Sequence, residues 1–271
     1  MLRFSQVVRA ISLLAAVLPL AGHDLYMMPE KFVVPPGAQL RVLFQNGDAF
    51  PKGSNSVKPE RLRNTRLLSR AGSADFDNIT DLKTHTTAMV RVPGAGLAIL
   101  TAHTIPTFIR LEAEKFKSYL THENLTAPLK WRQDHGEAGK PGLERYSKYV
   151  KSLIQSGQTD GYFAERAGLT IEIIPEADPY LLHAGAKLPV QVLFRGKPAA
   201  NVAVESAWLE KGVAKIVVVG RTDAAGKVIV PVKASGPHRL HAIVMERCAE
   251  PKIADWESFW ASLTFEIPSG H

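Results

Sequence analysis

LTIEII at residues 169–174 and LPVQVLF at residues 188–194 are short runs of β-branched and aliphatic residues, and they decide the fold class. Five runs of the same kind follow, at residues 202–207, 214–219, 228–232, 239–245 and 262–267. Turn sequences separate several of these runs, including Arg195-Gly196-Lys197-Pro198 and Asp223-Ala224-Ala225-Gly226-Lys227. Short strands with frequent turns are typical of a β-sandwich. We therefore predict a sandwich over residues 168–271.

The chain before residue 168 also has the pattern of a β-domain. Phe32–Val34 and Gln39–Phe44 flank the turn Pro35-Pro36-Gly37 and predict a β-hairpin. Further strand candidates lie at residues 66–68, 86–92, 96–103 and 107–111. The predicted fold is mainly β, with two β-sandwich domains that meet near Ala167-Gly168. The N-terminal domain spans residues 23–167, and the C-terminal domain is immunoglobulin- or transthyretin-like.

A helical insert is expected within the N-terminal domain, at about residues 112–156. Apolar residues recur there at i, i+3, i+7, i+10 and i+11, which places them on one face of a helix. They are Leu143, Tyr146, Val150, Leu153 and Ile154. Residues 112–120 predict a shorter helix, because Phe116 and Leu120 are four positions apart.

The first 22 residues have the features of a secretory signal peptide. Arg3 and Arg9 precede an apolar run at residues 10–20, and the small residues Ala21 and Gly22 follow it. The apolar run is too short to cross a bilayer. We therefore expect a periplasmic or secreted protein that is not integral to the membrane once the signal is removed.

Composition excludes several classes of function. The chain has 33 Lys and Arg against 26 Asp and Glu, but no long basic run, so we expect no nucleic-acid partner. Cys248 is the only cysteine, which excludes internal disulfides and multi-thiolate metal sites. No nucleophile elbow, phosphate loop, zinc-protease helix or dinucleotide fingerprint occurs. The sequence therefore assigns no catalytic residue and leaves enzymatic activity undecided.

His23 is the most informative candidate for a metal ligand. Cleavage after Gly22 would make it the N-terminal residue, whose free amine and imidazole can chelate Cu(II) or Ni(II). Cleavage after Ala21 would make it the second residue, and cleavage after Leu20 the third, in an Ala-Gly-His start that could bind copper or nickel through nitrogens. The alternative is that His23 only begins the first strand. A durable metal site needs further ligands, and we select His241 and His183 as candidates. Other histidines that could contribute are His103, His122, His135 and His238.

Two other features have both a functional and a structural interpretation. His238 and His241 are three positions apart, which places them on opposite faces of a strand rather than in one site. Trp256, Phe259 and Trp260 could form a stacking platform for a sugar, or they could cover the core of the sandwich, which is the commoner role of large aromatic residues.

Four segments together resemble one family of exported bacterial proteins. They are His23-Asp24-Leu25-Tyr26, the stretch at residues 136–149 (GEAGKPGLERYSKY), Ala177-Asp178-Pro179-Tyr180, and residues 254–265 (ADWESFWASLTF). The chain is similar over nearly all of its mature length to domain-of-unknown-function family 4198. Members are often labelled periplasmic components of nickel or cobalt uptake systems, so the resemblance implies an exported sandwich protein that handles metal. Val244 stands before Met245 where members often carry His, which weakens a metal site on that strand.

Three hypotheses about function follow. The first is an exported protein that binds nickel, cobalt or copper and supports metal uptake, with a transporter or another envelope protein as its partner. The second is a non-enzymatic interaction module without metal. The third is an oxidative enzyme in which His23 and a second histidine form a copper brace.

Overall fold

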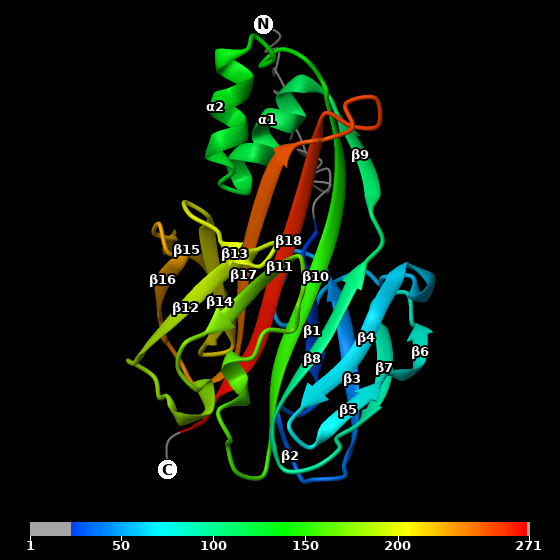
Figure 1. The fold of residues 1–271 in the computed structure, drawn as a ribbon, viewed down its shortest axis with the longest axis vertical. Helices are drawn as coiled ribbons and strands as arrows, with labels where there is room; N and C mark the ends of the chain where they lie inside the picture. The colour runs from blue at the N-terminus through cyan, green and yellow to red at the C-terminus, as the bar shows by residue number, and fades with distance from the viewer. Residues whose placement is uncertain (1–22, 270–271) are drawn as a thin grey trace, which may run out of the picture.

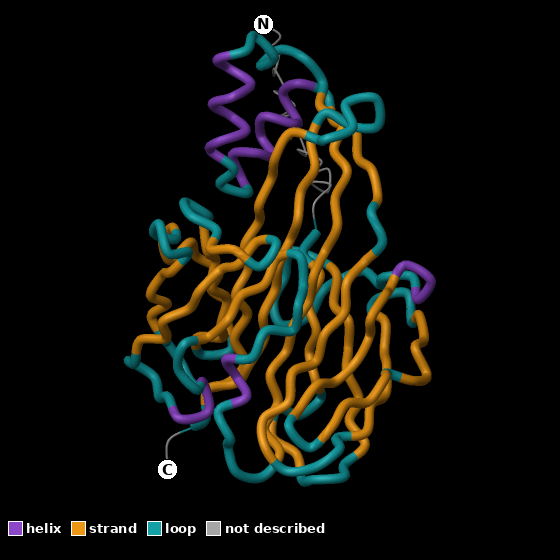
Figure 2. The backbone as a smooth tube through the Cα atoms, viewed as in Figure 1, coloured by secondary structure: helices purple, strands orange, loops and turns teal. Residues whose placement is uncertain are grey.

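The computed structural model describes residues 23–269, so the predicted signal peptide at residues 1–22 lies outside the described residues. Strands dominate the described residues and form three sheets there (Figures 1 and 2). The strands are β1 (Leu25–Pro29), β2 (Val33–Val34), β3 (Gln39–Asn46), β4 (Leu62–Ser69), β5 (Gly72–Asp75), β6 (Asp77–Asp81), β7 (Thr86–Arg91), β8 (Gly96–Thr104), β9 (Thr107–Leu111), β10 (Gly142–Ser156), β11 (Ile171–Pro175), β12 (Lys187–Phe194), β13 (Lys197–Pro198), β14 (Ala203–Glu210), β15 (Val213–Arg221), β16 (Lys227–Pro231), β17 (Gly236–Arg247) and β18 (Trp256–Ile267).

A ten-stranded central sheet runs through the molecule. Its main path is β15-β14-β17-β18-β10-β8-β4-β5, and β2 and β9 pair with β10 beside that path. β10 and β18 are parallel, with Glu144 opposite Trp256 and Ser152 opposite Thr264. The long middle strands therefore join the N-terminal and C-terminal halves of the chain into one sheet.

Two smaller sheets cover opposite faces of the central sheet. The sheet β1-β3-β7-β6 encloses one core, which includes Phe44 and Val90 together with Ala98, Leu100 and Ile154 of the central sheet. The sheet of β11, β12, β13 and β16 encloses the other core, to which the central sheet contributes Leu97, Ile99 and Leu153. Successive residues of a strand point to opposite faces, so β8 and β10 supply both cores. The predicted fold class, mainly β with two β-sandwiches, is confirmed.

In the part of the chain that the structure describes, helices are confined to one hairpin, α1 (Ala113–His122) and α2 (Thr126–Asp134), and to three short 3-10 turns at Pro59–Arg61, Tyr162–Ala164 and Pro179–Leu181. The hairpin stands beyond the two sandwiches, beside the ends of β10, β17 and β18 (Figure 1). Its buried residues Phe116, Tyr119 and Leu120 pack with Trp256 and Trp260 of β18. Within residues 23–269, no helix has the length and apolar character needed to cross a membrane.

The prediction of a helix over residues 143–154 is wrong, because this segment is the middle of the 15-residue strand β10. The predicted insert is helical only at α1 and α2. β10 lies between other strands and is covered on both faces, and it buries polar residues such as Glu144, Lys148 and Lys151. A strand that is buried on both faces does not alternate apolar and polar residues. The positions of the apolar residues in β10 therefore agreed by chance with the spacing of a helix.

The predicted hairpin over residues 32–44 is also wrong in its pairing. β2 pairs in parallel with β10, whereas β3 pairs with β1 and β7. The turn at Pro35–Gly37 therefore carries the chain from the central sheet to the smaller sheet. Local sequence predicted the strands correctly here, but long-range pairing decided their partners.

Candidate functional site

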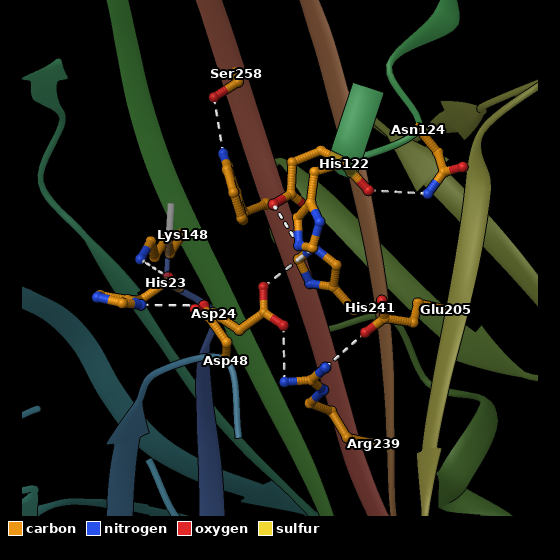
Figure 3. A network of polar contacts seen from close by, with 12 residues as sticks. His23, Asp24, Asp48, His122, Asn124, Lys148, Glu205, Arg239, His241 and Ser258 are labelled. Carbon is orange, nitrogen blue, oxygen red and sulfur yellow. Dashed lines mark hydrogen bonds and ion pairs between the residues drawn. The ribbon is translucent and has the colours of Figure 1, made fainter. Parts of the chain in front are cut away.

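A buried polar cluster surrounds Asp24, immediately before β1 (Figure 3). Asp24 Oδ2 lies 2.7 Å from Arg239 Nη1, and Asp24 Oδ1 lies 3.4 Å from His241 Nε2. Arg239 Nη2 also donates to Glu205 Oε1 at 2.6 Å. The Arg239 and Asp24 residues are only 1% and 8% exposed. We call Asp24, Glu205, Arg239 and His241 the Asp24 cluster.

Strand register explains how these residues meet. Arg239 and His241 are two positions apart on β17, so their side chains leave the same face of the sheet. His241 is the antiparallel partner of Glu205 on β14. β1 packs across β10 and β18, which brings Asp24 over this part of the central sheet. The cluster therefore joins residues from the two ends of the chain.

His23 lies beside the Asp24 cluster. Its ring nitrogen Nδ1 is 3.0 Å from Asp48 Oδ1, and its carbonyl oxygen accepts a hydrogen bond from the Lys148 ammonium group. Lys148 comes from β10 and is buried. The main chain at the predicted mature N-terminus is thus held against the central sheet.

The helical hairpin contributes two more side chains to this region. His122 is the last residue of α1, and its Nε2 lies 4.0 Å from Oε1 of Glu123. His122 is among the groups that lower the pKa of Asp24, and Asp24 and Glu205 add to the effect of burial in raising the pKa of Glu123. His122 and Glu123 therefore lie within Coulombic reach of the Asp24 cluster.

The electrostatics of the cluster are set by burial and by close opposite charges. Burial by itself would raise the pKa of Asp24, but His241, Arg239, Lys148 and His122 outweigh it, and the pKa is lowered. Burial lowers the pKa of His241, and the attraction of Asp24 offsets this effect only in part. Burial likewise lowers the pKa of Lys148 to about 8. Burial, reinforced by neighbouring carboxylates, raises the pKa of Glu123 to about 9.

The predicted metal ligands do not all come together. His23 and His241 both lie beside Asp24, one next to it in sequence and the other at 3.4 Å. His183 is exposed, and its Nδ1 contacts the carbonyl oxygen of its neighbour Ala184. Residues 23–269 contain no group of three or more His, Cys, Asp or Glu side chains arranged to hold a metal ion. His23 and His241 therefore lie near the same aspartate, but the ring of His23 is directed to Asp48 and not to His241 (Figure 3).

The remaining histidines lie elsewhere. His238 is buried and stacks on Phe265 at 5.6 Å between ring centroids, whereas the ring of His241 faces Trp260 at 5.4 Å. The prediction that these two residues lie on opposite faces of a strand agrees with the unbroken register of β17. His103 stacks on Tyr149, and His135 stacks on Trp131.

The aromatic residues of β18 serve packing. Trp256, Phe259 and Trp260 are 2%, 6% and 3% exposed, so they cover the core and present no stacking platform for a sugar. Trp260 Nε1 donates to the Ser258 hydroxyl, which in turn donates to Glu144. Cys248 is buried and free.

Sequence reasoning missed Arg239 and Lys148 as parts of the site. Arg239 is a charged residue in the predicted strand at residues 239–245. A charged residue in such a strand indicates a buried ion pair, so the sequence did contain a signal for it. Lys148 lies in the segment predicted to be a helix, so the error in secondary structure concealed its place in the central sheet. Asp24 was noted only as part of a motif, because its partners are distant in sequence.

The match to known proteins is limited to a family and to distant structures. No curated protein matches the chain. Among solved structures, the D0-D1 domain of Intimin is similar, with 13% identity, a TM-score of 0.23, and coverage of 90% of this chain and 97% of that one. Three N-terminal domains of the bacteriophage RB49 Highly Immunogenic Outer Capsid protein (Hoc) are similar with 12% identity, a TM-score of 0.17, and coverage of 89% and 59%.

The family model covers most of the chain, including every residue of the Asp24 cluster. It matches residues 20–246 and is described as a domain of unknown function. This range includes three of the four segments that resemble the family, whereas the fourth, residues 254–265, lies outside it. The chain belongs to the family Domain of unknown function (DUF4198).

Proposed function

We propose that this protein is an exported, non-catalytic binding protein of the bacterial envelope that holds a transition-metal cation (nickel, cobalt or copper) at His23, Asp24 and His241. It would act outside the cytoplasm, in the periplasm or after secretion, and would deliver the metal to an uptake transporter or another envelope protein. The family membership and the position of His23 beside the Asp24 cluster support this proposal.

One distance carries the proposal. Asp24 Oδ1 and His241 Nε2 are 3.4 Å apart, yet both ring nitrogens of the buried His241 lack a hydrogen-bond partner among the described residues. Two ligands at about 2.1 Å from one metal ion lie about 3.0 Å apart when adjacent in a square-planar or octahedral site, and about 3.4 Å apart in a tetrahedral site. The pair thus has the spacing of two metal ligands, while the other oxygen of Asp24 is oriented by Arg239.

The predicted N-terminus would complete the site. If cleavage follows Gly22, His23 offers its free amine and its imidazole, and the hydrogen bond from Lys148 holds its carbonyl oxygen near Asp24. Asp48 adds a carboxylate to the same region, and Glu123, whose pKa is raised to about 9, would have to lose its proton to bind a metal ion. Neutral imidazole, amine and carboxylate ligands suit Ni(II) and Cu(II).

The test uses the exported protein, whose N-terminus is established first by intact mass and N-terminal sequencing. Nickel, cobalt, copper and zinc are then titrated in competition with a chelating buffer. We expect one site per chain, and a His241→Ala variant should bind about 100-fold or more weakly, a larger loss than an outer hydrogen-bond partner causes. Thermal unfolding without metal checks that the variant is folded.

Two controls make the result specific. His183→Gln removes an exposed histidine outside the cluster and should leave the affinity unchanged. A protein that retains Gly22 before His23 should lose affinity without any change of fold, because its amine is displaced by one residue. Absence of binding tighter than the competing buffer, in a correctly processed protein, would overturn the proposal.

A second candidate function is an interaction module without metal. β15 is an edge strand of the central sheet, and Val213, Ile216, Val217 and Val218 on it are 59%, 38%, 44% and 44% exposed. An exposed apolar edge strand can pair with a strand of another protein. Crosslinking from the β15 edge in periplasmic extract should then capture one partner, and a Val217→Lys variant should lose it. An unchanged capture pattern in that variant would exclude this function.

A further inference from the structure

A cavity outside the Asp24 cluster is lined in part by Lys148. It has a volume of about 410 Å³, and nine residues line it. The strands that line it contribute Leu25 (β1), Asn46 (β3), Thr104 (β8), and Tyr146 and Lys148 (β10). The segment after β3 contributes Ser56, Val57, Lys58 and, from the first 3-10 turn, Arg61. We call it the basic pocket.

The charge of the basic pocket has one sign. Of the nine described residues that line it, Lys58, Arg61 and Lys148 are cationic, and none of the nine is acidic. Lys148 is only 8% exposed. The Lys148 ammonium group lies 5.5 Å from the Tyr146 ring centroid and 3.4 Å from Asn46 Oδ1. Like charges that converge on a partly dehydrated cavity repel one another, and an anion placed between them would remove that repulsion.

Hydrogen-bond donors surround the same space. Nε of Arg61 is buried and has no hydrogen-bond partner among the described residues. The hydroxyl groups of Ser56, Thr104 and Tyr146 and the side-chain amide of Asn46 also line the cavity. A guanidinium group with an unused N–H, together with an ammonium group and hydroxyls, is the donor set that binds carboxylate or phosphate oxygens.

We propose that the basic pocket is a binding site for a small oxyanion, either a carboxylate- or a phosphate-bearing molecule, held by Arg61, Lys58 and Lys148. Its volume lies within the range of about 300–1,000 Å³ that is usual for small-ligand sites, and exceeds the needs of one inorganic ion. This inference does not rest on the proposed metal function, because an oxyanion would occupy the pocket with or without a cation at Asp24.

The test measures binding of two probes, inorganic phosphate and citrate, to the metal-free exported protein by calorimetry at constant ionic strength, with chloride as the competing anion. Saturable one-to-one binding of either probe supports the proposal, and the stronger of the two identifies the chemistry of the ligand. Arg61→Gln should weaken that binding about tenfold to 100-fold, the effect of losing a charged hydrogen bond.

Two further variants keep the test decisive. Lys58→Gln alters an exposed side chain of the pocket, so it tests the site even if Arg61→Gln fails to fold. Arg63→Gln is the matched control, because Arg63 is two residues from Arg61 but directs its guanidinium group to the backbone oxygens of Glu60 and Leu62. Lack of saturable binding, or an equal loss of affinity in Arg63→Gln and Lys58→Gln, would overturn the proposal.

Discussion

Glu144 and Asp24 are both buried carboxylates, but their pKa values move in opposite directions. Arg239 lies 2.7 Å from Asp24, and the surrounding positive charges lower the pKa of Asp24. Glu144 instead accepts hydrogen bonds from the hydroxyls of Tyr119 and Ser258, and its Oε2 has no partner among the described residues. Burial therefore dominates at Glu144 and raises its pKa from 4.5 to about 7.

The raised pKa of Glu144 predicts a pH dependence of stability. Between pH 4.5 and about 7 the folded protein holds this proton more tightly than the unfolded chain does, so the free energy of unfolding falls as the pH rises through this range. The contribution of this one group is roughly 3 kcal/mol across the window. Glu144→Gln should remove that part of the slope, as measured by urea unfolding at several pH values. Identical slopes for both proteins would contradict the assignment.

The helical hairpin is fixed to the central sheet by close packing at the start of β10. Phe116 of α1 is fully buried, and a Cβ atom added at Gly142 would lie 2.5 Å from its ring. Tyr119 stacks on Trp260 at 6.2 Å between centroids, and Trp131 of α2 meets Trp256 edge-on at 5.4 Å. This packing places His122 and Glu123 near the Asp24 cluster, so the hairpin is part of the site.

Gly142→Ala is expected to lower the free energy of unfolding by about 1–3 kcal/mol, because the added methyl group overpacks the contact with Phe116. Combining it with Phe116→Leu, which makes room, should cost less than the sum of the two single changes in a double-mutant cycle. Gly139→Ala is the control, since no heavy atom lies within 4 Å of its added Cβ. Additive effects of Gly142→Ala and Phe116→Leu would show that the two residues do not clash.

At the scale of the whole molecule, the two sandwiches share their central strands. β8 and β10 send alternate side chains into the two cores, and β18, the last strand, pairs with β10. A buried ion pair, Lys151 with Glu172 at 2.7 Å, also connects β10 to the outer sheet of the C-terminal sandwich. Neither sandwich can therefore be separated without exposing the core of the other.

We expect the exported chain to unfold in a single cooperative transition in calorimetry, with equal calorimetric and van't Hoff enthalpies. A fragment of residues 168–271 should show no cooperative transition, because it lacks Leu97, Ile99 and Leu153 of its core and the strand that pairs with β18. Two resolved transitions in the whole chain, or cooperative unfolding of the fragment, would show that the sandwiches are independent.

Local sequence determined most of the strands and the family of this protein. The runs at residues 86–92, 96–103 and 188–194 became β7, β8 and β12 because β-branched residues and flanking turns act over a few positions. The four segments that resemble the family needed no structure to be recognised. His23 and His241 were candidates from residue type alone.

Tertiary structure alone decided the identity of β10 and the composition of the site. β10 is buried on both faces, so its residues follow no two-residue period, and only the neighbouring strands make it a strand. Asp24 meets Arg239 and His241 only because β1 packs across β10 and β18 of the central sheet. Contacts between the two ends of a chain depend on pairing and packing over long separations, which residue patterns within one segment do not encode.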